Sequence, residues 1–582
     1  MNVKHIFTLS AVFCVAAPLV SAQELDPTVV VNRAYEGKLV EMHKPAIEMA
    51  VPDSVNSFAL DFDYLVFEKP YKGADGFTPY VLMMKPSSAV YDPMRLYLNA
   101  GAGYTLHPTF DLVWSPFRSR SFKMDVYAVH RSYVGDYRAF RPILPSEGTL
   151  VVDRWRESGG DQAHWRGYDL MTEAGVDGRY ELSKLSLGFD VSYYGLASKD
   201  LRKRRMYDAV DFKIGVSSKP QNASYFRYDA LATYRFAEDK VKYSNAVNDY
   251  IGEHLFDLDL TLGQVMGGGH EILFDVGAEV AAYSHADMPV TAGELYMTPH
   301  YVMRKGRWNL DAGVRISKLL RSKNDAGLFG AAEQIVYPDI TASFDVIRNA
   351  MRAYAVIGGG NRLDTYASLL DRNHHFDMSF GRGRHPFMDV TVERVSASLG
   401  LEGRIGSIFS YDLRTGYVNY AGALLDAVMI DTEYLPGSGY SPYQKYYAAL
   451  DWRLASDAFR FDGNVMYSYV WGIRNGAGLF QPAALTGDVS FEYNWNRRIY
   501  AGVDCRFATA RHGSVIDVTA AETVYEAKIP GYADLGIYFE FAVNRVFSVW
   551  ARGGNLLNMS IQRNPLYVEK GINATVGICL NL

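Results

Sequence analysis

The sequence lacks several features on which membrane and secreted proteins commonly depend. Beyond its leader it has no apolar stretch of the roughly 20 residues that a membrane-spanning helix needs. The 582-residue chain has 3 cysteines, and two of them, Cys505 and Cys579, fall on opposite faces of their expected strands, so we expect no disulfide between them. The net charge of −6 provides no basic field, and we expect no nucleic-acid partner.

The first 22 residues have the pattern of a secretory signal peptide. Lys4 precedes an apolar run from Ile6 to Val20, and Val20-Ser21-Ala22 supplies a small-residue cleavage site. Only helices and closed barrels cross a bilayer, because every backbone polar group must be satisfied within lipid. An exported membrane protein without an apolar helix is therefore expected to be a β-barrel.

Long stretches of the chain alternate between apolar and polar residues, as half-buried strands do. Near the C-terminus the apolar positions are Val576, Ile578, Leu580 and Leu582. An earlier stretch alternates Phe256, Leu258, Leu260 and Leu262 with Asp257, Asp259 and Thr261. Full charges in the middle of strands indicate a wet lumen on one face, with lipid on the other.

The links between these stretches alternate short and long. Tight links are expected at Asp177-Gly178, 219–222, 266–269, 305–306, 348–349, 404–406, 456–458, 496–498 and 544–545. Longer polar connections are expected at 133–164, 196–204, 237–252, 361–388, 421–442 and 511–530. Outer-membrane barrels have short periplasmic turns and longer external loops. The rhythm therefore predicts one orientation for the whole chain.

Counting from the C-terminus gives about 22 strands, the first at 94–103 and the last at 571–582. The fold class is all-β, a transmembrane antiparallel β-barrel over residues 91–582. A soluble all-β protein is the alternative. Aromatic residues make up 14% of the chain and lie beside the tight links, for example Trp308 and Trp495, as an interfacial girdle requires. They favour the barrel.

The end of the chain resembles the C-terminal signature of TonB-dependent outer-membrane receptors. Gly554-Asn555-Leu556-Leu557-Asn558 is similar to the turn that opens the last external loop in that family. Asn564-Pro565-Leu566-Tyr567 and Gly571 are similar to the segment that leads into the closing strand. The strand count extends the resemblance to most of residues 91–582. Family members end on an aromatic residue, whereas this chain ends on Leu582.

Residues 23–90 depart from that family. The resemblance implies a plug domain of well over a hundred residues behind a short energy-coupling box, and this stretch is too short for it. Val29-Val30-Val31-Asn32-Arg33 is only a weak match to such a box. We expect a short irregular segment, interrupted by prolines, that either fills the lumen as a reduced stopper or docks on a periplasmic or lipoprotein partner. Docking is preferred, because 68 residues are few for so wide a lumen.

Candidate chemical sites are sparse. His374-His375 lies near Asp371, Asp377 and His385 in an expected external loop, where imidazole and carboxylate groups are suited to a transition metal. Solvated loop side chains are the preferred interpretation of this group. The basic run Arg202-Lys203-Arg204-Arg205 is suited to lipopolysaccharide phosphates, and here too a solvated loop is preferred.

Catalytic motifs are missing. His285 and His300 have no obvious serine partner, and no Gly-x-Ser-x-Gly elbow occurs. Gly267-Gly268-Gly269 and Gly358-Gly359-Gly360 open no helix and bring no following Lys-Ser/Thr, so turn and strand-end glycines explain them better than a phosphate loop. We predict no catalytic, cofactor-binding or metal-binding residues, no cofactor and no enzymatic activity.

Together these features predict a non-enzymatic barrel in the outer membrane of a Gram-negative bacterium. The first hypothesis is a receptor-like barrel without its own plug, which acts in transport or as a component of an outer-membrane complex. The alternative is an energy-coupled nutrient receptor whose plug is reduced or supplied by another chain. Expected partners are outer-membrane lipids, the barrel-assembly machinery and a protein that binds residues 23–90. The sequence does not identify a substrate.

Overall fold

The computed structural model describes most of the predicted barrel. The described residues are 95–104, 106–138, 150–151, 164–200, 203–220, 222–243, 248–285, 290–321, 334–376, 390–431, 433–473, 478–519 and 523–582. The signal peptide predicted for residues 1–22 and the segment 23–90 lie outside them, as do Asp377 and His385.

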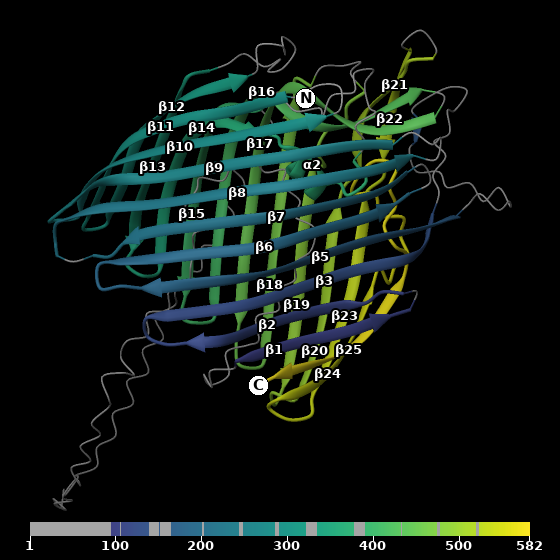
Figure 1. The fold of residues 1–582 in the computed structure, drawn as a ribbon, viewed down its shortest axis with the longest axis horizontal. Coiled ribbons are helices and arrows are strands. Elements are labelled where there is room, and N and C mark those ends of the chain that lie inside the picture. The colour runs from purple at the N-terminus through teal and green to yellow at the C-terminus, as the bar shows by residue number, and fades with distance from the viewer. Residues whose placement is uncertain are drawn as a thin grey trace, which may run out of the picture. The chain divides into compact units, whose positions relative to one another are not determined.

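Twenty-two strands form a closed antiparallel barrel, in agreement with the predicted fold and strand count (Figure 1). β1 and β25 close the ring, with Tyr97 opposite Asn581. The barrel strands are β1 (Leu96–Gly103), β2 (Thr109–Arg118), β3 (Phe122–Arg138), β5 (His164–Glu181), β6 (Leu185–Lys199), β7 (Lys203–Ser218), β8 (Tyr225–Tyr243), β9 (Asn248–Met266), β10 (His270–His285), β11 (Val290–Lys305), β12 (Trp308–Arg321), β13 (Val336–Ile347), β14 (Met351–Leu363), β15 (Val390–Ile405), β16 (Phe409–Asp431), β17 (Glu433–Ala455), β18 (Phe459–Trp471), β19 (Leu485–Trp495), β20 (Ile499–Ala508), β23 (Tyr532–Ala542), β24 (Phe547–Gly554) and β25 (Asn573–Asn581).

The period-two pattern divides the wall into a lipid face and a lumen face, as predicted. On β10, Ile272 and Phe274 point outward and remain 45% exposed, because only lipid covers them in the membrane. Asp275 points the other way and accepts a hydrogen bond from the Thr261 hydroxyl of β9 at 2.6 Å. No helix among the described residues is long and apolar enough to span a membrane.

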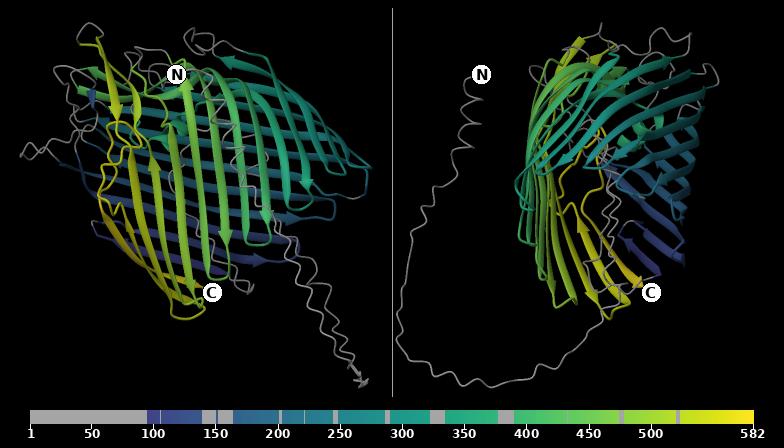
Figure 2. Two further views of the ribbon diagram at one scale, coloured as in Figure 1. Left: turned by 180° about the vertical axis from the view of Figure 1, so that it is seen from behind. Right: turned by 90° about the vertical axis from the view of Figure 1, so that its left-hand side faces the viewer.

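Tight turns gather at one end of the barrel, which we call the inner end because short turns face the periplasm in this class. Figure 2 shows these turns along one edge of the ring. Trp308 and Trp495 lie beside them and are 56% and 60% exposed, as the girdle prediction requires. One predicted turn is wrong: Asp177 and Gly178 lie within β5, paired with Asp190 and Phe189 of β6. The chain turns only after Glu181, because the alternation continues to that residue.

The opposite, outer end is richer in extra structure. Two predicted long connections, 237–252 and 421–442, are mostly strand. β8 and β9 extend into the first of them at the outer end, and β16 and β17 extend into the second. β16 and β17 have 23 residues each, whereas about 9–11 residues cross a membrane. Beyond the membrane one face no longer meets lipid, and residues 422–428 of β16 are buried on both faces by neighbouring segments. The alternation of polarity is lost there, so it does not distinguish strand from loop. β21 (Arg511–Asp517) and β22 (Thr523–Ile529) form a hairpin, and β21 pairs with the extension of β16. The short β4 (Leu150–Val151) pairs with β22.

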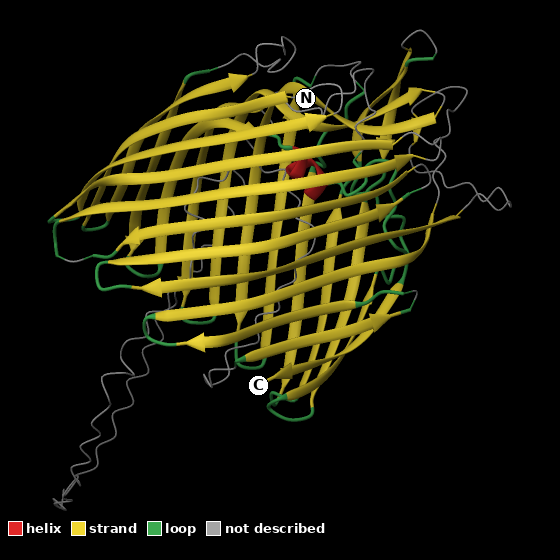
Figure 3. Ribbon diagram, viewed as in Figure 1, coloured by secondary structure: helices red, strands yellow, loops and turns green. Residues whose placement is uncertain are grey.

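The helix of the described residues, α2 (Tyr366–Arg372), lies within the ring of strands toward the outer end (Figure 3). It belongs to the predicted external loop between β14 and β15. It folds inward instead of outward, and its surroundings form the candidate site.

Candidate functional site: a loop segment held across the outer end of the lumen

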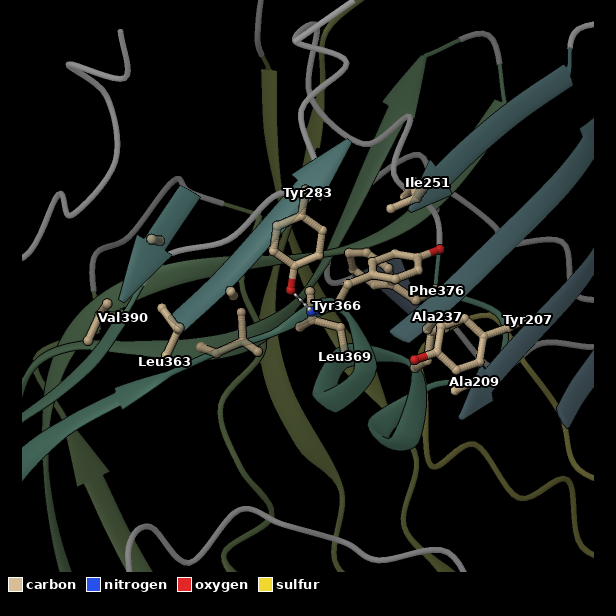
Figure 4. Packing of buried hydrophobic residues seen from close by; sticks show 14 of the residues in the cluster. Tyr207, Ala209, Ala237, Ile251, Tyr283, Leu363, Tyr366, Leu369, Phe376 and Val390 are labelled. Atoms are coloured by element: carbon tan, nitrogen blue, oxygen red, sulfur yellow. Dashed lines mark hydrogen bonds between the residues drawn. The ribbon is translucent and has the colours of Figure 1, made fainter. Parts of the chain in front are cut away.

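Residues 364–376, which we call the crossing segment, leave the end of β14 and enter the lumen. Thr365 caps α2, its hydroxyl accepting a hydrogen bond from the Ser368 N–H at 3.2 Å. Tyr366, Leu369 and Phe376 are 3% exposed or less and pack against lumen-facing side chains of the wall (Figure 4). Those partners include Leu196, Tyr207, Ile251 and Tyr283. A polar loop thus carries a hydrophobic face of its own.

A buried ion pair on the wall holds the two ends of the crossing segment. Arg205 of β7 and Asp239 of β8 lie 2.8 Å apart, with side chains 1% and 0% exposed. Tyr366 donates its hydroxyl to Asp239. Arg205 donates to the carbonyls of His374 at 2.9 Å and Phe376 at 2.6 Å. The guanidinium group therefore donates hydrogen bonds both to the Asp239 carboxylate and to the crossing segment.

Glu253 of β9 makes the second attachment. Its carboxylate accepts hydrogen bonds from the hydroxyls of Tyr207 at 2.9 Å and Tyr283 at 2.6 Å. It also accepts the backbone N–H of Ala367 at 3.1 Å, while the Tyr366 N–H donates to the Tyr283 hydroxyl at 3.1 Å. These N–H groups lie in the first turn of α2, which has no partners for them within the helix. An acidic side chain there also suits the positive end of the helix dipole.

Strands on another part of the wall grip the same segment. Arg372 at the end of α2 donates to Asp426 of β16 at 3.0 Å, and Arg511 of β21 reaches the same carboxylate at 2.5 Å. Asp364, at the start of the segment, accepts the hydroxyl of Tyr440 of β17 at 2.9 Å. The crossing segment is thus attached to two separate parts of the wall. One part is β7–β10 and the other is β16 and β17, and other barrel strands lie between them on both sides.

The last external loop, residues 555–572, meets the crossing segment at its end. The rings of His375 and Tyr567 stack with centroids 4.5 Å apart. The Tyr567 hydroxyl donates to Asp200 at 3.0 Å and to the His375 carbonyl at 3.3 Å. Tyr567 belongs to the motif that carried the family resemblance, so this signature residue has a structural role at the outer end.

Two adjacent histidines have opposite electrostatic surroundings. Burial alone would lower the pKa of His374, but the carboxylate of Asp169, 2.9 Å away, outweighs it and raises the pKa above its usual value. Burial lowers the pKa of His375 to about 4, against the attraction of Asp169 and Asp200. Near neutral pH, His375 therefore stays neutral against Tyr567, whereas the raised pKa of His374 favours its charged form beside Asp169.

The inner end of the lumen contrasts with this packing. A polar hollow of about 780 Å³ lies on the lumen wall there, and Asp345, Arg352, Glu402 and Arg453 are among its lining residues. Arg352 bridges Asp345 at 3.0 Å and Glu402 at 2.9 Å, with the arginine side chain 46% exposed. Charges therefore remain hydrated at this end.

The structure corrects several expectations about candidate residues. His374 and His375 are packed rather than solvated, and within the described part of the chain no three potential ligands gather around a metal position. Lys203 and Arg205 are 4% and 2% exposed on the lumen face, so half of the basic run is not a solvated loop. The reason is that β7 begins at Lys203 and alternates from there.

The remaining candidates fit the simpler interpretations. Gly268 and Gly269 adopt φ of 87° and 83° in an inner turn, as turn glycines do. Gly358–Gly360 lie in β14 at a bulge. His300 lies between Asp275 at 3.3 Å and Asp311 at 2.8 Å on the lumen wall. Cys505 and Cys579 are both free.

Sequence reasoning missed the attachments at Arg205, Asp239, Glu253 and Asp426. Asp239 and Asp426 were assigned to the external connections 237–252 and 421–442, where charges are ordinary, and Glu253 to the first position of the strand that follows the first of them. The available signal was the alternation of β8 through Ala237, Asp239 and Val241, all buried on the lumen face.

Comparison with known proteins supports the fold. No protein-family model matches the chain, and no curated protein matches it in sequence. Solved structures do: the FrpB iron transporter from Neisseria meningitidis matches with a TM-score of 0.59 at 10% identity, over 84% of this chain and 81% of that one. The copper transporter OprC matches with a TM-score of 0.60 at 10% identity, over 84% and 80%. The siderophore receptor PirA from Acinetobacter baumannii matches with a TM-score of 0.56 at 8% identity, over 84% and 80%.

These neighbours are TonB-dependent receptors with 22-strand barrels. The prediction of a closed antiparallel β-barrel of about 22 strands is therefore confirmed.

Proposed function

We propose that this chain is a receptor-like outer-membrane barrel that works without a plug of its own, as a non-enzymatic part of outer-membrane transport or of an outer-membrane complex. The observation that carries the proposal is the crossing segment. It occupies the outer end of the lumen and is attached to β7–β10 and to β16 and β17 through buried charges. A segment held in this way across the outer end narrows the lumen without a plug, which supports a barrel that works without one of its own.

The buried attachments also argue that the closed form is a defined state. The Arg205–Asp239 pair lies wholly on the wall and stays paired if the crossing segment moves away, but Arg205, Asp239 and Glu253 would each lose hydrogen bonds to the segment. A hydrogen bond to a charged group contributes about 1.5–3 kcal/mol. Small thermal fluctuations therefore do not open this end. Opening requires a ligand or partner that binds the open form more tightly than the closed form.

The alternative is an energy-coupled uptake receptor whose plug is reduced or supplied by another chain. The structural neighbours, which include an iron transporter, a copper transporter and a siderophore receptor, favour it. The two functions differ in what residues 23–90 do. In the first, these residues dock on a periplasmic or lipoprotein partner; in the second, they take part in coupling or in filling the lumen.

Purification from detergent-solubilised outer membrane tests the proposal. The full chain and a form lacking residues 23–90 but keeping the signal peptide are isolated side by side, and insertion of both is checked by heat-modifiable migration. We expect both to insert, because all barrel strands remain, and we expect outer-membrane lipoproteins to co-purify with the full chain only. Specific recovery of TonB with the full chain, without lipoproteins, would instead establish the energy-coupled receptor.

A further inference from the structure

Three basic residues form a row on the lipid face at the outer end of neighbouring strands. Lys199 is the last residue of β6 and lies directly opposite Arg204 of β7. Arg204 in turn lies opposite Lys242, near the end of β8. All three side chains are exposed. They point outward because Lys203 and Arg205, the neighbours of Arg204, point into the lumen.

The row is an unfavourable arrangement unless an anion binds to it. Side chains directly opposite on adjacent strands lie about 5 Å apart at Cβ, and like charges there repel. Tyr168 and Asn248, the residues opposite the two ends of the row, bring no negative charge. The nearest acidic residues on this face already have partners: Glu238 pairs with Lys240 at 3.2 Å, and Asp208 accepts the Tyr193 hydroxyl at 2.6 Å.

Below the row the same strands present an apolar wall. Met206, Phe212 and Ile214 of β7 are 51%, 47% and 65% exposed. Val191 of β6 and Phe236 of β8 flank them at 42% and 39%. The surface is thus amphipathic along the membrane normal, with cations at the outer rim and hydrocarbon contacts beneath them. A molecule that fits both parts carries phosphate groups at one end and acyl chains at the other.

We propose that the outer face of β6–β8 is a docking site for a phosphorylated lipid of the outer leaflet. Its phosphates lie in the row of Lys199, Arg204 and Lys242, and its acyl chains lie along Met206, Phe212 and Ile214. Arg204 in the centre presents the planar donor group that binds phosphate through paired hydrogen bonds. The site lies on the opposite side of the same strand from Arg205. A lipid bound here therefore contacts the strand that anchors the crossing segment.

Native mass spectrometry of the full-length protein in detergent tests the site. The probe is bis-phosphorylated lipid A, titrated against the wild type and the triple variant Lys199→Gln, Arg204→Gln, Lys242→Gln. The matched control carries Arg120→Gln, Lys184→Gln and Lys305→Gln, which remove the same charge from exposed positions at the inner end. We expect the first triple variant to bind lipid A about ten- to a hundredfold more weakly than wild type, and the control to bind as wild type does.

Two further measurements distinguish a lipid phosphate from free inorganic phosphate. Lipid A lacking its phosphates should bind wild type as weakly as bis-phosphorylated lipid A binds the triple variant. Millimolar inorganic phosphate should not displace the lipid, because it lacks the acyl contacts. Equal lipid binding by both triple variants, or displacement by inorganic phosphate alone, would overturn the proposal. Circular dichroism of each variant verifies that the barrel is intact.

Discussion

The two ends of the lumen carry the same kinds of charged residues in opposite states. At the inner end, Arg453 bridges Asp462 at 2.9 Å, with side chains 57% and 19% exposed. At the outer end, Arg205 bridges Asp239 at 2.8 Å, with side chains 1% and 0% exposed. The two distances are nearly equal, so geometry alone does not separate the pairs. What differs is the crossing segment, which covers the outer pair and leaves the inner one in water.

The difference shows how burial decides what an ion pair does. Exposed pairs contribute about 0–1 kcal/mol, because water screens the attraction. Buried pairs add little net stability, yet breaking one costs much more because the remaining charge is left without a partner. The inner charges therefore keep the wall hydrated, while the outer charges hold a segment in place.

The largest effect is expected from removing the buried cation. Arg205→Ala leaves the Asp239 carboxylate unpaired and removes the donors to His374 and Phe376. We expect the free energy for opening the crossing segment to fall by about 3–5 kcal/mol, measured by hydrogen exchange of the α2 amides. Arg453→Ala is the matched change at the inner end and should alter the same amides by less than about 1 kcal/mol. Equal effects of the two variants would show that the buried outer pair holds the crossing segment no more strongly than the exposed inner pair does.

A smaller effect is expected where the two loops meet. Tyr567→Phe keeps the ring stack with His375 but removes the hydroxyl that donates to Asp200 and to the His375 carbonyl. Because Asp200 is only 6% exposed, the loss should cost about 1–3 kcal/mol in the same exchange measurement. Tyr467→Phe, at a lipid-face tyrosine that is 52% exposed, serves as the control and should change nothing. Unchanged hydrogen exchange of the α2 amides in Tyr567→Phe would show that the last external loop does not stabilise the crossing segment.

Acidification should have a smaller effect still. His375 has a pKa of about 4 in the packed segment and about 6.5 when released. A lowered pKa of a base means that the released form takes up the proton first, so the closed state loses stability as pH falls below 6.5. Between that pH and about pH 5 we expect a loss of about 1–2 kcal/mol.

His375→Phe retains a ring against Tyr567 and cannot titrate, so its closure should be insensitive over this interval. His374 acts in the other direction. Its raised pKa makes its contribution complete at low pH and lost as pH rises through that pKa, and Asp169→Asn should remove that alkaline loss. A wild type whose α2 exchange has no acid dependence would contradict the assignment of a neutral, packed His375.

The fold was predictable from the sequence to a much greater degree than the site. Period-two alternation and the spacing of the turns are local properties, and they predicted the strand count, the position of the tight turns at one end of the barrel and the lipid face. The mistaken turn at Asp177-Gly178 shows their limit: a charged residue and a glycine resemble a turn wherever they occur, and only pairing with β6 decides. The crossing segment depends on contacts such as Arg205 with Tyr366, which are 161 residues apart. No local pattern reports that a polar loop folds inward.

Planar-bilayer conductance tests the central claim, that the chain's own external loop closes the outer end, most directly. In one form Tyr366–Phe376 is replaced by a Gly/Ser linker of equal length; in the other, residues 23–90 are deleted. Heat-modifiable migration verifies that each form folds as a barrel. Arg205→Ala keeps the full loop, so a rise in its conductance arises from opening of the crossing segment rather than from misfolding. We expect a large rise in ion conductance for the linker form, an intermediate rise for Arg205→Ala, and wild-type conductance after deletion of 23–90. A large pore that forms only when 23–90 is deleted would contradict it and would identify that segment as the stopper.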